Sequence, residues 1–569
     1  MPCCCSTNQR RGFLIPRNPL HWRTHPLTTP RPLRFLIIGA GSRGTAYARA
    51  VTTATQGTIH AVAEPHPFKR QFLGRSYIWG EDGTPQDGQE FADWRDWLQW
   101  ELKRRETLST LNTSTPSPTP IGVDGVFICT LDSTHVSILH ALAPLKLHIL
   151  CEKPLALSLT DCLSIYRILT PNQSTNIFSI GHVLRYSPHN TLLRSLLLVD
   201  RVIGDIISLE HTEPVGFWHF AHSYVRGNWR RETPTGDGSL LTKSCHDIDF
   251  IMWLMCSPAP NAASRAPHHL PSTISSSGVL SQFIKARKPA KAGPATNCLA
   301  CPVERDCVYS AVRIYHDMHL EKGDIDWPVN IVCEDIEDVV RAASATADES
   351  NPPNTDINSP KSHLFARLAE DYPPPTTPEQ ETAIHSRPWY GRCVYESDNS
   401  VLDSQTVTLT WSSSPAQPNN NGATFHPKTA LFHMIAATEK QCERRGRIYG
   451  TAGELTYDSR TITIYDFQTR SSRTIDVPRP PNPEEEKAHG GGDYGLARGF
   501  VDAVDKVVNW GWEVDEAQRT FVGCDLEEVV RSHAVVFAAE EARREGVVVR
   551  WGEWWERKLG DVEEGGREV

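Results

Sequence analysis

The tripeptide Glu152-Lys153-Pro154 places a lysine at the end of a predicted buried strand, because it directly follows the apolar run Leu147–Leu150. In parallel α/β sheets, ligands bind in the crevice at the carboxyl ends of the strands. A lysine held there could hydrogen-bond a substrate hydroxyl and exchange its proton while a hydride leaves the neighbouring carbon. The alternative is a solvated lysine before a turn-forming proline. Spacing alone does not separate the two interpretations.

A glycine-rich segment upstream predicts a dinucleotide. Gly39-Ala40-Gly41-Ser42-Arg43-Gly44 follows the apolar run Leu33–Ile38 and precedes a helical stretch that begins at Thr45. In such a loop the first glycine makes the turn, the second lets the backbone approach a pyrophosphate, and the third allows close helix–strand packing. The helix that follows offers free N–H groups and its positive dipole end to phosphate. A glycine turn without a ligand is the alternative.

Glu64 indicates which dinucleotide this would be. It ends the next predicted strand, 58–63, where an acid can accept hydrogen bonds from a ribose diol. A carboxylate there also repels a 2′-phosphate, which favours NAD over NADP. Lys69 and Arg70 lie close enough in sequence to weaken that preference, so NADP stays open.

A third polar group begins a predicted helix, Ser244–Cys256. Apolar residues at positions i, i+3, i+4 and i+7, counted from Ile248, mark its buried face. His246 lies about 200° from Ile248 around the helix and shares a different face with Lys243. Histidine titrates near neutral pH and suits proton exchange with a substrate oxygen. The alternative is a structural histidine beside Asp249.

Together these motifs resemble the Gfo/Idh/MocA family of oxidoreductases. The resemblance covers residues 33–256 well and 390–555 more loosely. It implies α/β architecture: an N-terminal Rossmann domain, then an α+β domain with a large, open, mostly antiparallel sheet. It also implies hydride transfer between NAD(P) and a sugar, an inositol or a related polyol. The segments that carry it are Gly39–Gly44, Ala63-Glu64-Pro65, Asp132-Ser133-Thr134-His135, Glu152-Lys153-Pro154 and His246-Asp247-Ile248-Asp249.

The same resemblance implies roles for individual residues. The implied catalytic residues are Lys153, His246 and Lys243. The implied cofactor-binding residues are Gly39, Ala40, Gly41, Ser42, Arg43, Gly44, Glu64, Thr130, Glu152 and Arg185.

This chain departs from the family pattern at two places. Many members carry an Asp four residues before the catalytic histidine, where this chain has Thr242. Lys243 resembles a subgroup with lysine at its site, so the resemblance implies a proton relay from Lys153 through Lys243 to His246. A neighbouring ammonium group would lower the pKa of Lys243. In Gly181–Pro188, His182 replaces the usual Asn while Arg185 is kept.

Two further regions could shape a substrate pocket. Phe217–Phe220 and Gly227–Arg230 combine aromatic rings with polar groups, which suits the C–H faces and hydroxyls of a polyol, although a packed loop is equally compatible. The loop His489–Asp493 could close over the site, with His489 or Asp493 touching substrate. It could also be a plain helix start capped by Asp493.

The elements around these motifs predict two domains. Strand–helix alternation with continuously apolar strands up to about residue 175 indicates a parallel sheet covered on both faces. Longer alternating strands then begin at Ile206, with helices expected at 244–256, 495–508 and 515–544. We therefore predict a basic disordered tail at 1–32, a Rossmann domain at 33–175, an α+β domain at 176–556 and an acidic tail at 557–569. Insertions are expected near 257–296, 342–388 and 412–422.

The bulk composition excludes some classes of protein. The chain has 569 residues and a formal charge of −10, which gives no indication of nucleic-acid binding. No run of 18 apolar residues predicts a membrane span. Several of the 15 cysteines lie in apolar elements, and no signal-peptide core precedes them, so we expect a reducing, cytoplasmic location. The resemblance adds an expected homo-oligomer, with a small polyol or sugar as substrate.

Cys298, Cys301 and Cys307 leave three interpretations open. Their first spacing suits a metal site, for which Cys333 might supply a fourth ligand, but the second gap is irregular and no partner pair is visible. A redox-active or disulfide pair is the second interpretation. Buried thiols without metal are the third, and the sequence favours them.

Two other functions remain open. Some members of the resembled family use bound NAD transiently to cleave glycosidic or other bonds, as a glycosidase or lyase. A non-catalytic sensor, in which the dinucleotide sets partner binding, would be expected to have lost the lysine or the histidine. Both are present here.

Overall fold

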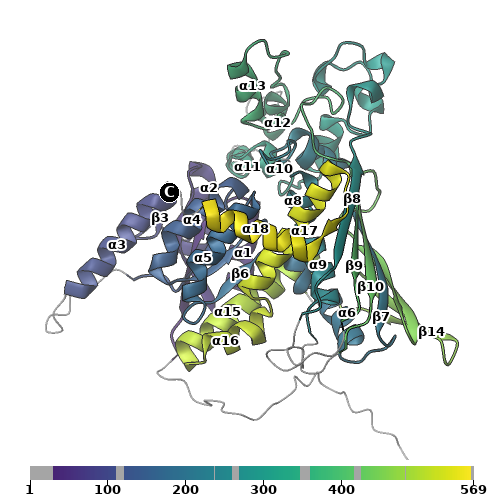
Figure 1. Cartoon of the computed structure of the whole chain (residues 1–569). Coiled ribbons are helices and arrows are strands. Elements are labelled where there is room, and N and C mark those ends of the chain that lie inside the picture. Colours follow the sequence, from purple (N-terminus) through teal and green to yellow (C-terminus); the bar gives the residue numbers. More distant parts are fainter. Residues whose placement is uncertain are drawn as a thin grey trace, which may run out of the picture.

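The computed structural model describes residues 30–110, 121–235, 237–258, 268–345, 359–414, 424–480 and 482–565. They form two sheets with helices packed between them and a helical lobe at one end (Figure 1). Within these ranges no helix is both long and apolar enough to cross a membrane. The predicted basic tail falls almost wholly on residues outside the described ranges, as does most of the expected insertion at 412–422.

The first sheet is a six-stranded parallel Rossmann sheet in the order β3-β2-β1-β4-β5-β6. The strand order reverses between β1 and β4, and the crevice at such a switch point is where dinucleotides bind. Every residue of β4 and β5 is buried, as expected for strands covered on both faces. The strands are β1 (Leu33–Ile38), β2 (Gly57–Ala63), β3 (Glu90–Phe91), β4 (Gly125–Ile128), β5 (His148–Cys151) and β6 (Phe178–Ile180).

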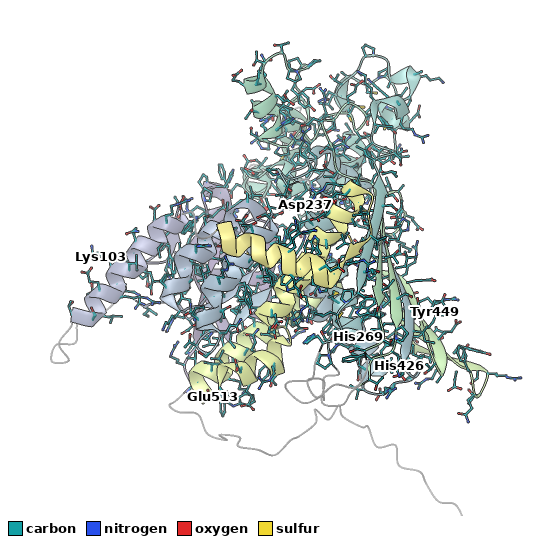
Figure 2. All side chains as sticks on the ribbon, viewed as in Figure 1. Lys103, Asp237, His269, His426, Tyr449 and Glu513 are labelled. Atoms are coloured by element: carbon teal, nitrogen blue, oxygen red, sulfur yellow. The ribbon has the colours of Figure 1, made fainter. Side chains whose placement is uncertain are left out.

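Helices cover this sheet and connect its strands. One of them, α3, projects away from the rest of the molecule and carries exposed Lys103 (Figure 2). The helices of this region are α1 (Ser42–Ala54), α2 (Pro67–Gly74), α3 (Trp94–Thr110), α4 (His135–Leu142) and α5 (Leu159–Leu169). Helix α6 (Pro188–Leu198) follows β6 and leads into the second domain (Figure 1).

The second sheet has nine strands in the order β14-β13-β12-β11-β7-β10-β9-β8-β15. Its described pairings are antiparallel except β7–β10, which is parallel. Burial alternates along β9, so one face of the sheet is packed and the other is open. The strands are β7 (Ile206–Pro214), β8 (Thr273–Val279), β9 (Ser404–Trp411), β10 (Lys428–Ile435), β11 (Arg445–Gly450), β12 (Gly453–Tyr457), β13 (Thr461–Asp466), β14 (Ser471–Asp476) and β15 (Val549–Arg550).

Helices cover the packed face of this sheet and join it to the first domain. Helix α17 contacts β8 and α9 of the second domain and α5 of the first, while α15 packs on α1. Asp237 lies beside α17 (Figure 2), close enough for the charges of Glu540 and Arg544 on that helix to affect its carboxylate. The helices are α7 (Phe217–Phe220), α8 (Ser239–Thr242), α9 (Cys245–Met255), α14 (Pro483–Lys487), α15 (Gly492–Trp510), α16 (Val514–Ala517), α17 (Leu526–Glu545) and α18 (Trp551–Gly565).

The described residues between β8 and β9, at 280–345 and 359–403, form the helical lobe at the top of Figure 1. The lobe has a hydrophobic core of its own that includes Ile314, Tyr315, Val329 and Leu364. Its α-helices are α10 (Val329–Val332), α11 (Ile336–Ala345), α12 (Pro360–Leu368) and α13 (Pro378–His385). The described part of the expected insertion at 342–388 is therefore largely helical.

The predicted order of a Rossmann domain followed by a mostly antiparallel sheet is confirmed. The first sheet, however, extends past residue 175, because β6 pairs with β5. Part of the expected insertion at 257–296 is β8, which pairs with β9 in the second sheet. The polar, serine-rich sequence of β8 concealed this, since an edge-proximal strand with one open face needs few apolar residues.

The helix predicted over 515–544 is interrupted. Gly523 has φ +63°, in the left-handed region that ends helices, and Asp525 then caps α17 through a capping box with Glu528. The segment after Leu559, expected to fray, continues α18 as far as Gly565.

Candidate functional site

The glycine loop between β1 and α1 has the shape that a pyrophosphate requires. Gly39 has φ +94°, and a Cβ there would lie 2.7 Å from the Cys129 carbonyl oxygen. A Cβ on Gly44 would lie 2.0 Å from the Gly39 carbonyl oxygen, so the helix packs too closely on the loop for a side chain. Gly41 has open space around its Cβ position, and no side chain caps α1. The first N–H groups of α1 are thus free for an anion.

Glu64 lies at the carboxyl end of β2 and is buried. Its carboxylate accepts hydrogen bonds from the backbone N–H of Ala40 at 2.8 Å and of His66 at 2.7 Å, which hold it against the glycine loop. Arg70 pairs with Glu90 at 2.9 Å, and the Lys69 ammonium donates to the Asn330 carbonyl. Arg70 also donates to the Glu64 carbonyl oxygen at 2.6 Å, so its positive charge stays beside the acid.

Arg43, in the glycine loop, joins three elements. Its guanidinium contacts Glu152 after β5 at 2.8 Å and Asp493 in the first turn of α15 at 2.8 Å. Tyr47 also donates to Glu152, at 2.6 Å. Burial acts to raise the pKa of Asp493, but Arg43 and His489 outweigh it, so that pKa is lowered. This buried ion pair fixes the loop against the strand end that delivers Lys153.

Lys153 reaches from the Rossmann sheet to the second domain. Its Nζ donates to the Thr242 carbonyl oxygen at 2.7 Å, in the link between α8 and α9. Lys243 and His246 lie in and just after that link. Lys153 is thus brought beside Lys243 and His246, which lie much further along the chain.

Lys243 is held as a cation. Its ammonium lies 3.2 Å from Glu213 at the end of β7 and 3.0 Å from Cys442 Sγ. Burial acts to lower the pKa of Lys243, but the negative charge beside it prevails and the pKa is raised. Glu213 is the effective partner, because burial raises the pKa of Cys442 and keeps it a neutral thiol. The expectation of a lowered pKa at Lys243 was wrong, because it did not include the Glu213 carboxylate that faces this lysine.

His246 is a neutral imidazole in this environment. Burial, Arg444 and the two lysines together hold its pKa well below 6.5, despite the opposing effect of Asp247. Arg444 donates to Nε2 at 2.7 Å, so the proton of the ring sits on Nδ1, which is buried and has no hydrogen-bond partner among the described residues. The expected titration near neutral pH is therefore not what the structure supports.

Sequence reasoning missed Glu213 and Arg444. Arg444 bridges Glu213 at 2.5 Å and Asp247 at 3.0 Å, and His211 contacts Asp247 at 2.9 Å. Glu213 occupies the same buried register of β7 as Leu209 and His211. An acid in the apolar register of a strand was the available signal, because such a charge needs buried partners.

Two family profiles match this chain. The NAD-binding Rossmann fold of the Gfo/Idh/MocA oxidoreductases matches residues 33–182, and the family's C-terminal alpha/beta domain matches residues 197–273. The chain matches the Gfo/Idh/MocA family in both of its domains. Its first domain is accordingly an NAD-binding Rossmann domain, as the glycine loop and Glu64 indicate.

Three proteins illustrate what this chain is similar to. A 2,7-anhydro-N-acetylneuraminate hydratase from Mediterraneibacter gnavus is 28% identical over 141 residues, which are 23% of this chain and 33% of the hydratase. Inositol 2-dehydrogenase 2 from Paenarthrobacter aurescens is 26% identical over 147 residues, 25% of this chain and 40% of that protein. The chain thus matches well under half the length of these relatives. The structure of an inositol dehydrogenase homolog with NAD+ from Azotobacter vinelandii aligns over 91% of this chain and 97% of its own, with 13% identity and a TM-score of 0.52, which indicates a shared fold.

The predicted pocket segments lie beside this family site. Trp229 Nε1 donates to Asp132 at 3.0 Å, joining the aromatic segment to the loop after β4. Burial raises the pKa of Asp132, against the lowering effect of His135 and Lys153. His219 Nδ1 lies 3.5 Å from Cys442 Sγ, next to Lys243. Both aromatic segments therefore border the lysine and histidine cluster.

Two other predictions change. Arg185 is buried and makes two hydrogen bonds to Asp249, at 2.7 and 2.8 Å. Its guanidinium is thus bound to α9, and we interpret it as positioning that helix rather than binding cofactor. Asp493 does not cap α15, which begins after Gly491; it pairs with Arg43 instead. Thr130 lies just after β4, and its Oγ1 accepts from Thr134 at 2.6 Å.

Proposed function

We propose that this protein is an NAD-dependent oxidoreductase that acts on a CH–OH group of a sugar, inositol or related polyol. Oxidation in this sense moves a hydride from the substrate carbon to the nicotinamide and releases the hydroxyl proton, leaving a carbonyl. The observation that carries the proposal is the hydrogen bond from Lys153 Nζ to the Thr242 carbonyl. It sets the lysine at the end of β5 beside Lys243 and His246, at the switch-point edge of the cofactor sheet.

The residues that would hold NAD fit it. The glycine loop and the uncapped start of α1 suit the pyrophosphate, and Glu64 suits the ribose diol. When bound, NAD supplies the hydride acceptor. The buried Glu64 carboxylate would repel a 2′-phosphate, although Arg70 lies beside it and donates to the Glu64 carbonyl at 2.6 Å. We therefore propose NAD as the preferred cofactor.

The proton chemistry would fall mainly to Lys153. One N–H of Lys153 is used by Thr242, and another can hydrogen-bond the substrate oxygen. In its neutral amine form the lysine would accept the hydroxyl proton on oxidation, and as the ammonium it would return a proton in the reverse reaction. His246 would donate from Nδ1 to the same oxygen, because Arg444 occupies its Nε2. Lys243, kept charged by Glu213, would act as a fixed positive charge that favours the developing alkoxide. This arrangement replaces the relay through Lys243.

The test is a panel of sugars, inositols and amino sugars followed at about 340 nm with NAD and NADP separately. On any substrate found, Lys153→Met should lower kcat by roughly 10²-fold to 10⁴-fold while the NAD dissociation constant stays within a few-fold. Lys69→Met, on α2, is the matched control and should keep full kcat. Full turnover by Lys153→Met would refute the assigned role.

A second candidate is transient use of tightly held NAD to break or hydrate a bond. One observation favours it: the M. gnavus relative is a 2,7-anhydro-N-acetylneuraminate hydratase. That compound therefore belongs in the panel. Product formation with no net change at 340 nm, and NAD that co-purifies with the protein, would select this reading. NAD-dependent binding of a protein partner with no turnover on any compound would instead indicate a sensor.

A further inference from the structure

Four cysteines from two distant stretches of the helical lobe are folded together. Cys298, Cys301 and Cys307 lie in a series of tight turns, in which Cys301 N donates to the Cys298 carbonyl and Cys307 N to the Glu304 carbonyl. Cys393 belongs to the neighbouring stretch: Cys298 N donates to the Gly391 carbonyl at 2.9 Å, and Cys393 N to the Thr296 carbonyl at 2.8 Å. All four are free thiols.

The two stretches that carry the cysteines are built alike. They repeat the same Cys-Val-Tyr sequence, at Cys307 and at Cys393, and their tyrosine rings meet edge to face at 6.2 Å. The Ala311 N–H donates to Cys298 Sγ at 3.5 Å, an interaction that stabilises a negative sulfur.

A buried cation faces the same group. Arg226 is 1% exposed and donates to Cys298 Sγ, to the Tyr309 carbonyl at 2.7 Å and to the Arg392 carbonyl at 2.7 Å. Arg226 thus contacts Cys298 directly, Tyr309 near Cys307, and Arg392 next to Cys393. Among the described residues it has no carboxylate partner, which is rare for a buried guanidinium.

We propose that Cys298, Cys301, Cys307 and Cys393 bind a metal centre through four thiolates. Four thiolates around a divalent ion or a cluster leave a net negative charge, which gives Arg226 the counter-charge it lacks. Cys333, considered from the sequence as a fourth ligand, lies in the lobe core beside Arg367 and Asp335 and is not a member.

The four sulfurs are not close enough together for a single zinc ion, which leaves an iron–sulfur cluster as the four-thiolate centre to test. A single tetrahedral zinc, with Zn–S bonds of about 2.3 Å, draws its four sulfurs to within about 4 Å of one another. In the described parts of the chain, no three of these cysteines have sulfurs all within 4.8 Å of each other. A cluster that carries one cysteine on each of four iron atoms spans more widely separated thiolates.

Such a centre would hold the lobe to the wall of the candidate site. Arg226 ends the π-helical turn Ala221–Arg226, which directly follows α7 and its aromatic residues. The centre would fix the stretch that carries His219 and Trp229 without contacting substrate. Its role is accordingly structural, and no electron transfer is implied.

The test is metal and sulfide analysis of the full-length protein purified without oxygen. We expect about four iron and four sulfide ions per chain, with broad visible absorption. Cys393→Ser should lose most of the iron, whereas Cys333→Ala, a matched control in the same lobe, should keep it. One zinc per chain, lost in Cys393→Ser, would overturn the iron–sulfur assignment and support the four-thiolate site. The unmodified protein with neither metal, or with two of these cysteines in a disulfide, would overturn the site altogether.

Discussion

Arg43 should contribute strongly to the stability of the cofactor domain, and Arg43→Met tests this. Its guanidinium is 28% exposed, while the Glu152 and Asp493 side chains it joins are 7% and 3% exposed. Removing one partner of a buried ion pair costs about 3–5 kcal/mol, because a charge is left uncompensated. We expect about 3 kcal/mol, the lower end, since Arg43 is partly exposed and Glu152 keeps Tyr47 as a donor.

The assay is hydrogen exchange of the amides at the start of α15, supported by urea denaturation. A loss of about 3 kcal/mol corresponds to exchange roughly a hundredfold faster. Arg49→Met is the matched control on the same helix: its pair with Glu484 spans 3.4 Å between exposed side chains and should contribute under about 1 kcal/mol. Equal exchange in the two variants would refute the reasoning.

The pH dependence follows from the carboxylates. Burial acts to raise the pKa of Glu152 and of Asp493, but Arg43 lowers both, so their stabilising effect is present above about pH 4.5 and is lost as pH falls below that. The difference between wild type and Arg43→Met should therefore be full near pH 7 and shrink below pH 4.5. Adding Glu152→Gln and Asp493→Asn to Arg43→Met should restore part of the stability. If it restores none, packing rather than charge explains the loss.

Three further predictions concern the loop, a buried histidine and the pocket. Gly41→Ala should leave the unliganded protein as stable as wild type but weaken NAD binding about tenfold or more in titration. Gly44→Ala should lower the melting temperature in calorimetry, because its Cβ would meet the Gly39 carbonyl. The same melting temperature and the same NAD affinity for both variants would contradict this. Burial lowers the pKa of His148 from 6.5 to about 4, so the protein should lose about 2 kcal/mol between pH 7 and pH 5 through this residue alone. In urea denaturation, His148→Asn should lack this pH-dependent loss of stability. If the variant keeps the pH dependence of wild type, His148 is not the cause of the loss. Trp229→Phe, which deletes the N–H to Asp132, should lower kcat/KM about fivefold to tenfold with NAD affinity unchanged, and a wild-type kcat/KM would count against this contact.

Much of the cofactor half followed from local sequence patterns. The strands that precede Gly39 and Glu152 are mostly apolar and almost wholly buried, because both faces of a parallel sheet are covered. Backbone geometry requires Gly39 and Gly44, and Glu64 follows β2 directly. Such features are short-range, so the residues that cause them lie next to one another in the chain. The second sheet was harder to delimit, since β8 is polar and α17 starts from a capping box within an apparently continuous helix.

The electrostatics around the candidate catalytic residues were decided by the tertiary structure. Lys243 keeps its charge because Glu213 lies beside it at the end of β7. Burial, and then Arg444 from the stretch before β11, keep His246 neutral. Neither partner has a motif, and each contact joins residues far apart in the chain. In the same way, the tertiary structure pairs the stretch of Cys298, Cys301 and Cys307 with that of Cys393 rather than Cys333. The sequence by itself determined the fold class, the cofactor loop and the identity of the lysine and histidine. Their charge states depend on which buried groups face each other, and only the packing of the two domains decides that.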